Sequence, residues 1–376
     1  MTRTPRILQA AGHAAGGTGV HVADLSTGLR AAGEQVLVVA PADTAERFDL
    51  GSVDSQAWPP MRHPRQALRA LRRLRRLVRT SDVVHAHGHQ AGLVSLVAAI
   101  GTRTPVIISW HNAILAQRGL GALAQRWQVR SAALVTGASQ DLVDDARELG
   151  ARVSELAPVA APAAGSWAGT REEARAQVEA ILGLEQPAGQ SNEPGELWML
   201  TVSRIAPQKD LGVLVEAARE VAATPTEHPV RWIVVGDGDD DLRHTLIAAI
   251  GDLPVHLVGA RSDVPLWMAA CDLLVVPSRW EARALVVQEA LAAGLPVVAT
   301  DVGGLPELVT GCGALVPVGD SSALAAAVEH LVGDDARRAE LSDAATRRFA
   351  ELPTSDEVVA AWQARYQRVG RSSLVG

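Results

Sequence analysis

Lysine, cysteine and aromatic residues are all scarce in this chain of 376 residues. Lysine occurs once, as Lys209, among 35 basic residues. The two cysteines, Cys271 and Cys312, are too few for a disulfide framework and are typical of reduced core thiols. No apolar run approaches the ~20 residues that cross a bilayer, and the first residues lack the apolar core of a signal peptide. We therefore expect a cytoplasmic protein.

The charge balance and composition narrow the function class. A net charge of −7 argues against a general nucleic-acid-binding protein, since such proteins present a basic surface. Apolar residues make up 48% of the chain and charged residues 20%, which indicates a globular protein with a large core. The length is sufficient for two domains of ordinary size.

Short β-branched runs alternate with amphipathic helical patterns, which predicts an α/β protein with parallel sheets. The stretch 157–169 is rich in Ala, Pro and Gly and is typical of a hinge between domains. The pattern then restarts, so we expect two Rossmann-like, doubly wound domains that face a cleft. The predicted strands are 6–11, 35–40, 83–86, 106–110, 133–137, 197–203, 231–236, 255–258, 273–277 and 296–300. The predicted helices are 18–32, 64–80, 90–100, 139–149, 171–182, 209–221, 242–250, 264–270, 284–293, 322–331, 336–351 and 354–369.

The lone lysine lies in a loop that follows the apolar run 197–202, and Arg204 precedes it by five residues. Arginine has replaced lysine everywhere else, which suggests that this position requires a compact, flexible ammonium rather than a planar guanidinium. Two cations in a loop after a strand can hold a diphosphate. The alternative is the chance survival of one surface lysine.

A second candidate site is the segment 277–290, where a strand ends, a turn follows and a helix begins. A helix start offers free N–H groups and the positive end of the helix dipole, which suits a phosphate. Glu281 lies in the turn, and we expect Glu289 to lie roughly two turns into that helix. These carboxylates can accept hydrogen bonds from sugar hydroxyls on either side of that phosphate.

These motifs, taken in order, resemble the retaining glycosyltransferases of family four, which have the GT-B fold. The resemblance covers nearly the whole chain, and its most specific motifs lie in the second half. The first-half motifs are Gly16-Gly17-Thr18-Gly19-Val20-His21-Val22, Asp82-Val83-Val84-His85-Ala86-His87-Gly88 and Ser109-Trp110-His111-Asn112. The second-half motifs are Arg204…Lys209, Gly236-Asp237-Gly238, Pro277-Ser278…Glu281…Glu289 and Gly294-Leu295-Pro296-Val297-Val298-Ala299-Thr300.

The resemblance implies roles for these residues. Arg204 and Lys209 would bind the donor diphosphate and stabilise charge on the departing nucleotide. Glu281 would hold a donor-sugar hydroxyl, Glu289 the ribose hydroxyls, and His111 would lie beside the donor sugar and the acceptor. The other implied donor-binding residues are Gly16, Gly17, Gly236, Val258, Arg283, Ala284 and Leu285. The implied acceptor-side residues are Gly17, His85, His87, His111 and Asn112.

The resemblance also implies an organisation and a reaction. Residues 1–165 would bind the acceptor, residues 166–352 the nucleotide-sugar donor, and the helix in 353–376 would pack back on the first domain. The donor would be a UDP- or GDP-linked hexose, used with retention and without a metal or other cofactor. The leaving phosphate would help to deprotonate the acceptor hydroxyl of a small molecule, a glycan or a lipid-linked sugar.

One departure from the family concerns the turn at 282–284. The family usually has Gly-Phe-Gly after the glutamate, whereas this chain has Ala282, Arg283 and Ala284. If the glycines take positive φ, alanine costs roughly 1 kcal/mol or more there. Arg283 is then either a third cation for the phosphate or acceptor, or a solvent-facing side chain.

The segment 61–79 carries eight arginines between leucines at helical spacing. A basic amphipathic helix is typical of a membrane-surface element attracted to anionic lipid. The alternative is a helix whose leucines cover the sheet and whose arginines are solvated. The candidate membrane contacts are Arg69, Arg72, Arg73 and Arg76.

Several alternatives remain open at this point. The alternating His85, His87 and His89 suggest a metal site or, more simply, the acceptor cleft. The aspartates of 237–241 suggest a metal–diphosphate site or the charge at a helix start. Competing functions are a catalytically silent sugar-nucleotide-binding module, an epimerase or a phosphorylase of the same fold. An NAD-dependent oxidoreductase is disfavoured because G-x-G-x-x-G is absent.

Overall fold

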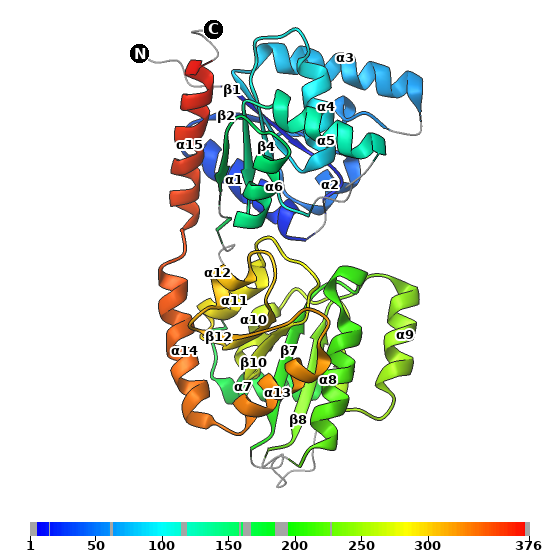
Figure 1. Cartoon of the computed structure of the whole chain (residues 1–376), viewed down its shortest axis with the longest axis vertical. Helices are drawn as coiled ribbons and strands as arrows, with labels where there is room; N and C mark the ends of the chain where they lie inside the picture. Colours follow the sequence, from blue (N-terminus) through cyan, green and yellow to red (C-terminus); the bar gives the residue numbers. More distant parts are fainter. Residues whose placement is uncertain are drawn as a thin grey trace. The chain divides into compact units, whose positions relative to one another are not determined.

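Parallel strands dominate the computed structural model, which describes residues 6–14, 16–60, 63–113, 119–157, 159–160, 167–184, 195–225 and 228–372. Two units divide the chain: unit 1 contains Met1–Pro162 and Pro353–Gly376, and unit 2 contains Ala163–Leu352 (Figure 1). Within the described residues, each unit holds one six-stranded sheet whose paired strands are all parallel. This confirms the predicted α/β class with two doubly wound parallel sheets.

The sheet of unit 1 has the strand order β2-β1-β3-β4-β5-β6. Its strands are β1 (Arg6–Ala11), β2 (Gln35–Val39), β3 (Val83–His87), β4 (Val106–Trp110), β5 (Leu134–Gly137) and β6 (Ser154–Leu156). Its helices are α1 (Gly17–Ala31), α2 (Ala42–Arg47), α3 (Pro64–Thr80), α4 (His89–Ala99), α5 (Gly119–Ser131), α6 (Gln140–Glu148) and α15 (Ser355–Ser372). Strands buried on both faces favour apolar residues at nearly every position, as in β4, whereas β3 also buries His85 and His87.

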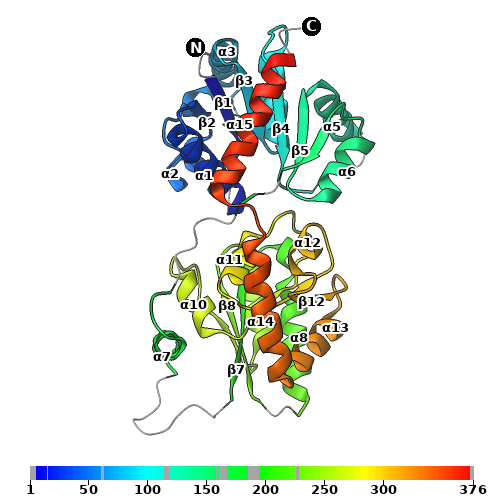
Figure 2. The ribbon, with the colours of Figure 1, turned by 90° about the vertical axis from the view of Figure 1, so that its left-hand side faces the viewer.

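Helix α15 returns to unit 1 and packs against α1; Figure 2 shows it lying over the strands of that unit. Trp362 is 1% exposed and joins the core formed by α1 and the inner faces of β1, β3 and β4. Tyr366 places its hydroxyl 2.8 Å from Nδ1 of His85, in the middle of β3. The last helix in the sequence is therefore part of the first unit's core.

The sheet of unit 2 has the order β12-β11-β10-β7-β8-β9. Its strands are β7 (Leu197–Val202), β8 (Val230–Val235), β9 (Val255–Leu257), β10 (Leu273–Val276), β11 (Val297–Thr300) and β12 (Gly313–Val316). Its helices are α7 (Arg171–Leu182), α8 (Leu211–Ala223), α9 (Asp240–Ile250), α10 (Val264–Ala270), α11 (Leu285–Ala292), α12 (Leu305–Val309), α13 (Ser321–Val332) and α14 (Asp335–Ala350). Two apolar clusters, one on each face of this sheet, form its core.

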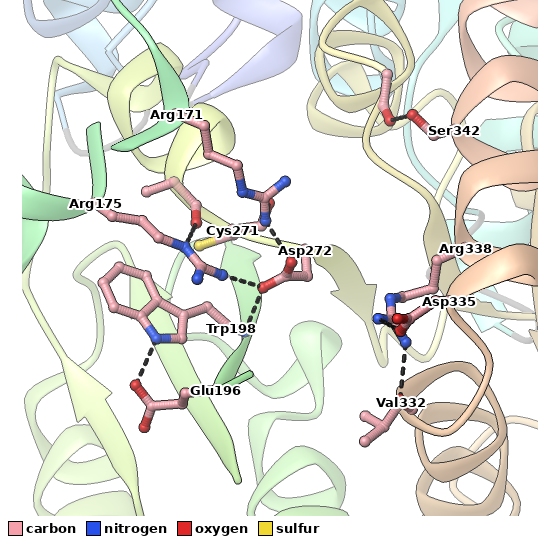
Figure 3. A network of polar contacts seen from close by, with 12 residues as sticks. Arg171, Arg175, Glu196, Trp198, Cys271, Asp272, Val332, Asp335, Arg338 and Ser342 are labelled. Atoms are coloured by element: carbon pink, nitrogen blue, oxygen red, sulfur yellow. Dashed lines mark hydrogen bonds and ion pairs between the residues drawn. The ribbon is translucent and has the colours of Figure 1, made fainter. Parts of the chain in front are cut away.

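A carboxylate ties α7 to the sheet of unit 2 (Figure 3). Asp272, just before β10, accepts hydrogen bonds from the Trp198 backbone N–H at 2.7 Å and from Arg175 at 2.6 Å, and it also pairs with Arg171. Three donors on one poorly exposed carboxylate fix the first strand of unit 2 against the helix that precedes it.

Several elements were not predicted: α2, α5, α12, β6 and β12. The elements α2, α12, β6 and β12 are too short for a periodic pattern to stand out. Helix α5 is longer, but it opens with two glycines among its first three residues, which weakens its helical pattern. Most of the predicted hinge, namely residues 158 and 161–166, lies outside the described residues. Within the described part of the chain, no helix is both long enough and apolar enough to cross a membrane.

Candidate functional site

The first cluster of functional candidates lies at the carboxyl edge of the unit 2 sheet. Arg204 and Lys209 follow β7, Gly236 follows β8, Val258 follows β9 and Glu281 follows β10. Because these four strands are neighbours in the order β10-β7-β8-β9, their carboxyl ends lie side by side. This is the edge at which open α/β sheets bind ligands.

Close backbone packing holds the loop after β7 in place. The Ile205 N–H donates to Asp237 O at 3.1 Å, and the Asp239 N–H donates to Ile205 O at 2.9 Å. Gly236 has φ +145°, and a Cβ there would lie 1.8 Å from the carbonyl oxygen of Ser203. Only glycine allows the two loops to approach this closely.

Lys209 and Glu281 are brought into direct contact, although 72 residues separate them in sequence. The Lys209 ammonium pairs with Oε1 of Glu281, and both side chains are largely buried. The same carboxylate oxygen accepts a hydrogen bond from the Ser278 hydroxyl at 2.8 Å. Ser278 was not predicted as a site residue; its position three residues before Glu281, at the end of a strand, was the available signal.

Arg204 differs from Lys209 in its surroundings. It is exposed, and within the described residues its guanidinium has no ion pair or hydrogen bond. An exposed, unpaired guanidinium in the same loop as Lys209 can bind an anion without first breaking a protein contact. Asp210, next to Lys209, has a positive φ of 49°, and no other non-glycine residue in the described part of the chain has one. Such local strain is frequent at functional loops.

The turn at 282–284 is not strained by its alanines. Neither Ala282 nor Ala284 has a positive φ, and Ala284 lies at φ −74° as the residue before α11. The side chain of Arg283 is 6% exposed and pairs with Glu307 at 3.6 Å. Arg283 is therefore neither solvent-facing nor directed to the Lys209–Glu281 pair by any described contact, and its expected contact with the donor stays a prediction.

Glu289 lies one turn into α11 and is partly buried. Burial raises the pKa of its carboxyl to about 7. Leu285, the first residue of α11, presents a helix-start N–H close in sequence to Glu281. The Asp239 side chain accepts from the Leu242 N–H at 3.0 Å, which supports the helix-start interpretation of the aspartates of 237–241.

If Glu289 accepts hydrogen bonds from the ribose hydroxyls of a nucleotide, as the family resemblance implies, nucleotide affinity should depend on the ionisation of its carboxyl group. A carboxylate accepts hydroxyl hydrogen bonds better than a carboxylic acid, so ligand binding favours the ionised form. Affinity should therefore rise as the pH increases through about 7, by up to about tenfold between pH 6 and pH 8. Glu289→Gln should flatten this dependence of affinity on pH. Both proteins are titrated with the same nucleotide, so the ionisation of the nucleotide affects the two profiles equally. Parallel wild-type and variant profiles would contradict the expected contact of Glu289 with the ribose hydroxyls.

The second cluster lies in unit 1 and consists of histidine rings at the carboxyl edge of its sheet. His87 ends β3, His111 follows β4, and His21 projects from α1. His87 Nδ1 lies 3.3 Å from His111 Nε2. Burial lowers the pKa of His21 to about 4 and that of His111 to about 3, so both rings are neutral at pH 7. His21 was not predicted; its signal was its place in the first helix after β1.

The other expected acceptor-side residues are placed differently. His85 is fully buried, and its two ring nitrogens contact Tyr366 Oη at 2.8 Å and Ser109 Oγ at 2.7 Å. It therefore anchors α15 to the sheet and offers no ring nitrogen to a ligand. Asn112 is exposed, and its carbonyl oxygen lies 3.3 Å from His89 Nε2.

The glycines of the first loop lie at the start of α1. Gly16 and Gly17 are both exposed, and Gly16 takes φ 65° as the residue before the helix. A positive φ at this point is best met by glycine, and it leaves the helix-start N–H groups uncovered.

The chain resembles known proteins over nearly its whole length. Two family models match: "Glycosyl transferase 4-like domain" over residues 16–162 and "Glycosyl transferases group 1" over residues 196–334. A D-inositol 3-phosphate glycosyltransferase of Jonesia denitrificans is 28% identical over 403 residues, covering 94% of this chain and 91% of that protein. One of Streptomyces avermitilis is 32% identical over 324 residues, covering 77% and 67%. The crystal structure of Anabaena HepE in complex with UDP and glucose matches with a TM-score of 0.78 and 22% identity, covering 96% and 99%, which shows likeness of fold.

Proposed function

The chain belongs to the family-four glycosyltransferases with the GT-B fold, and from this premise we propose that it transfers a hexose from a UDP-sugar to an acceptor hydroxyl with retention. The observation that carries the proposal is the convergence of Arg204, Lys209 and Glu281 after adjacent strands of unit 2. Two cations suit a diphosphate, and a carboxylate held beside them suits a sugar hydroxyl.

The Lys209–Glu281 contact suggests how the donor would be bound. A diphosphate offers Lys209 a more highly charged partner than one carboxylate, so its ammonium would turn to the phosphates. Glu281 would then be free to accept a hydrogen bond from the sugar, while Ser278 keeps its carboxylate in place. During transfer, Arg204 and Lys209 would stabilise the charge that develops on the leaving diphosphate, which requires no change in their position.

The acceptor would bind to unit 1. The neutral rings of His87 and His111 can donate or accept hydrogen bonds but carry no positive charge at pH 7. They would therefore orient hydroxyl groups, and the leaving phosphate would take the acceptor proton. Two acceptor classes follow from different observations: the names of the relatives favour a phosphorylated polyol, and the surface of unit 1 favours a lipid-linked acceptor.

Binding and turnover together test the proposal. The protein is screened by thermal shift against UDP, GDP, ADP and NAD, each with and without magnesium, and then assayed with UDP-hexoses and both acceptor classes. We expect stabilisation by UDP that is independent of magnesium, and transfer with retained anomeric configuration. Binding without transfer would favour a silent module, sugar epimerisation would favour the epimerase, and stabilisation by NAD alone would overturn the proposal.

A basic and apolar face of unit 1 supports docking to an anionic membrane. On α3, Ala70, Leu74 and Val78 are buried, which agrees with the sheet-covering interpretation of that stripe. The opposite side of α3 is exposed and arginine-rich. The helices α3, α4 and α5 pack in succession. The exposed residues on this layer include Arg65, Leu68, Arg69, Arg72, Arg73, Arg76, Arg79, Val97, Ile100, Leu120, Leu123, Arg126, Trp127 and Arg130.

Exposed arginines beside exposed apolar side chains are the combination that interfacial binding requires. Each arginine near an anionic membrane surface contributes about 1 kcal/mol to the free energy of membrane binding. We expect the protein to co-sediment with anionic vesicles and not with neutral ones. Arg72→Glu with Arg76→Glu should reduce this binding at least about tenfold, and added salt should weaken it. The charge-matched double variant Arg337→Glu with Arg347→Glu, on α14, should leave vesicle binding unchanged. Equal losses of vesicle binding in the two double variants would reject docking through α3.

A further inference from the structure

Three histidine rings from separate elements meet at one point of unit 1. His87 ends β3, His111 follows β4, and His21 lies in the helix after β1. Because β1, β3 and β4 are adjacent parallel strands, the backbone itself brings these positions together. One ring nitrogen of each histidine lies within 4.8 Å of the other two. Within the described part of the chain, no other group of three histidine, cysteine or acidic residues brings its possible metal-binding atoms this close together.

The spacing of two of these nitrogens matches metal coordination. His87 Nδ1 and His111 Nε2 are 3.3 Å apart. Two imidazole nitrogens bound to one zinc ion at the usual length, with tetrahedral angles, are about 3.3–3.4 Å apart. The His21 nitrogen is no further than 4.8 Å from either, so an approach of at most about 1.5 Å would complete three corners of a tetrahedron. Rotation of the side chain can supply such a movement.

A hydrogen bond between two imidazoles is the simpler explanation of the 3.3 Å contact, but it accounts for only part of the cluster. It gives no role to His21, which is 5% exposed and has its ring 5.3 Å from that of His111. A metal ion bound to one nitrogen of each ring uses all three histidines and therefore explains more of the arrangement.

We propose that His21, His87 and His111 form a binding site for one divalent transition-metal ion of the Zn²⁺ type. Three imidazoles suit Zn²⁺, Co²⁺, Ni²⁺ and Cu²⁺, whereas Mg²⁺ requires oxygen ligands. The fourth coordination position is left for water or an acceptor oxygen, as in sites where three histidines hold zinc. The three histidines belong to unit 1, whereas Arg204 and Lys209 belong to unit 2.

Metal occupancy should inhibit transfer, because it would engage the His87 and His111 nitrogens that otherwise orient hydroxyl groups. This consequence rests on the proposed function, whereas the binding of the metal does not. Metal binding without any transferase activity would therefore leave the site standing and remove only the inhibition.

The test uses the full chain without a histidine tag, treated with a chelator and titrated with Co²⁺, followed by displacement with Zn²⁺. We expect one Co²⁺ per chain, with the strong visible absorption of four-coordinate cobalt, and displacement by Zn²⁺ but not by Mg²⁺. His21→Ala and His111→Ala should each weaken binding at least about 100-fold, beyond the usual loss from an outer-shell change. His330→Ala, an exposed histidine on α13 of unit 2, is the matched control and should bind as the wild type does.

Circular dichroism and nucleotide binding by unit 2 verify that each variant is folded. If His111→Ala does not fold, His111→Gln replaces it, because an amide keeps the polarity and approximate size of the ring; His21→Gln serves in the same way for His21→Ala. The proposal is overturned if the wild type binds no more tightly than His21→Ala and His111→Ala, or if the cobalt spectrum is that of a six-coordinate aqueous ion.

Discussion

Replacing Lys209 with alanine should lower kcat by about 100- to 1,000-fold and leave the protein folded. The expected loss is that of removing one preorganised charge-stabilising group from a transition state. Lys209 is placed for this role by its loop after β7 and by its contact with Glu281. Steady-state rates with the donor identified by the nucleotide screen, together with the thermal midpoint, provide the measurement.

Lys209→Arg separates charge from shape. A guanidinium keeps the positive charge but is planar and larger, and the oxygen of Glu281 that Lys209 contacts also accepts a hydrogen bond from Ser278. We expect this variant to retain part of the activity and to remain less active than the wild type. Activity equal to that of the wild type would mean that any cation serves, and the scarcity of lysine would then carry no functional information. Near-normal turnover in Lys209→Ala would remove the main support for the phosphate role.

Gly236→Ala should have the second largest effect, through structure rather than charge. Its Cβ would lie 1.8 Å from the Ser203 carbonyl oxygen, and φ +145° is unfavourable for alanine. The loop that carries Arg204 would have to move away from the loop after β8. We expect a stability loss of at least about 3 kcal/mol and a donor affinity reduced more than about tenfold. Thermal unfolding and nucleotide titration measure the two effects.

Gly212→Ala is the matched control. It lies on α8 in the same unit, and a Cβ there would meet no atom within 4 Å. Because alanine restricts the unfolded chain and favours a helix, we expect it to be neutral or to stabilise the protein by about 0.5 kcal/mol. A Gly236→Ala protein as stable as this control would show that the loops after β7 and β8 do not need their close approach.

Local sequence patterns predicted most elements of the fold because their periodicity is strong. The helix α3 was predicted with its bounds, since its leucines recur at helical spacing and a proline begins it. Strand–turn–helix order was sufficient to place Arg204, Lys209 and Glu281 at a sheet edge, whereas their donor-binding roles were inferred from the family resemblance. Short elements such as β12 and α12 were not predicted, since four or five residues contain too few repeats for a periodic pattern to be recognised.

Contacts between distant residues decided the rest. The sequence alone shows that Lys209 is the only lysine and indicates that Glu281 follows a strand. Only the pairing of β10 with β7 in the sheet brings their side chains together. Likewise, the periodicity of the last helix does not reveal that Tyr366 meets His85, or that His21 joins His87 and His111. The physical reason is that local patterning encodes which face of an element is buried, whereas the choice of partner depends on strand order and packing across the whole unit.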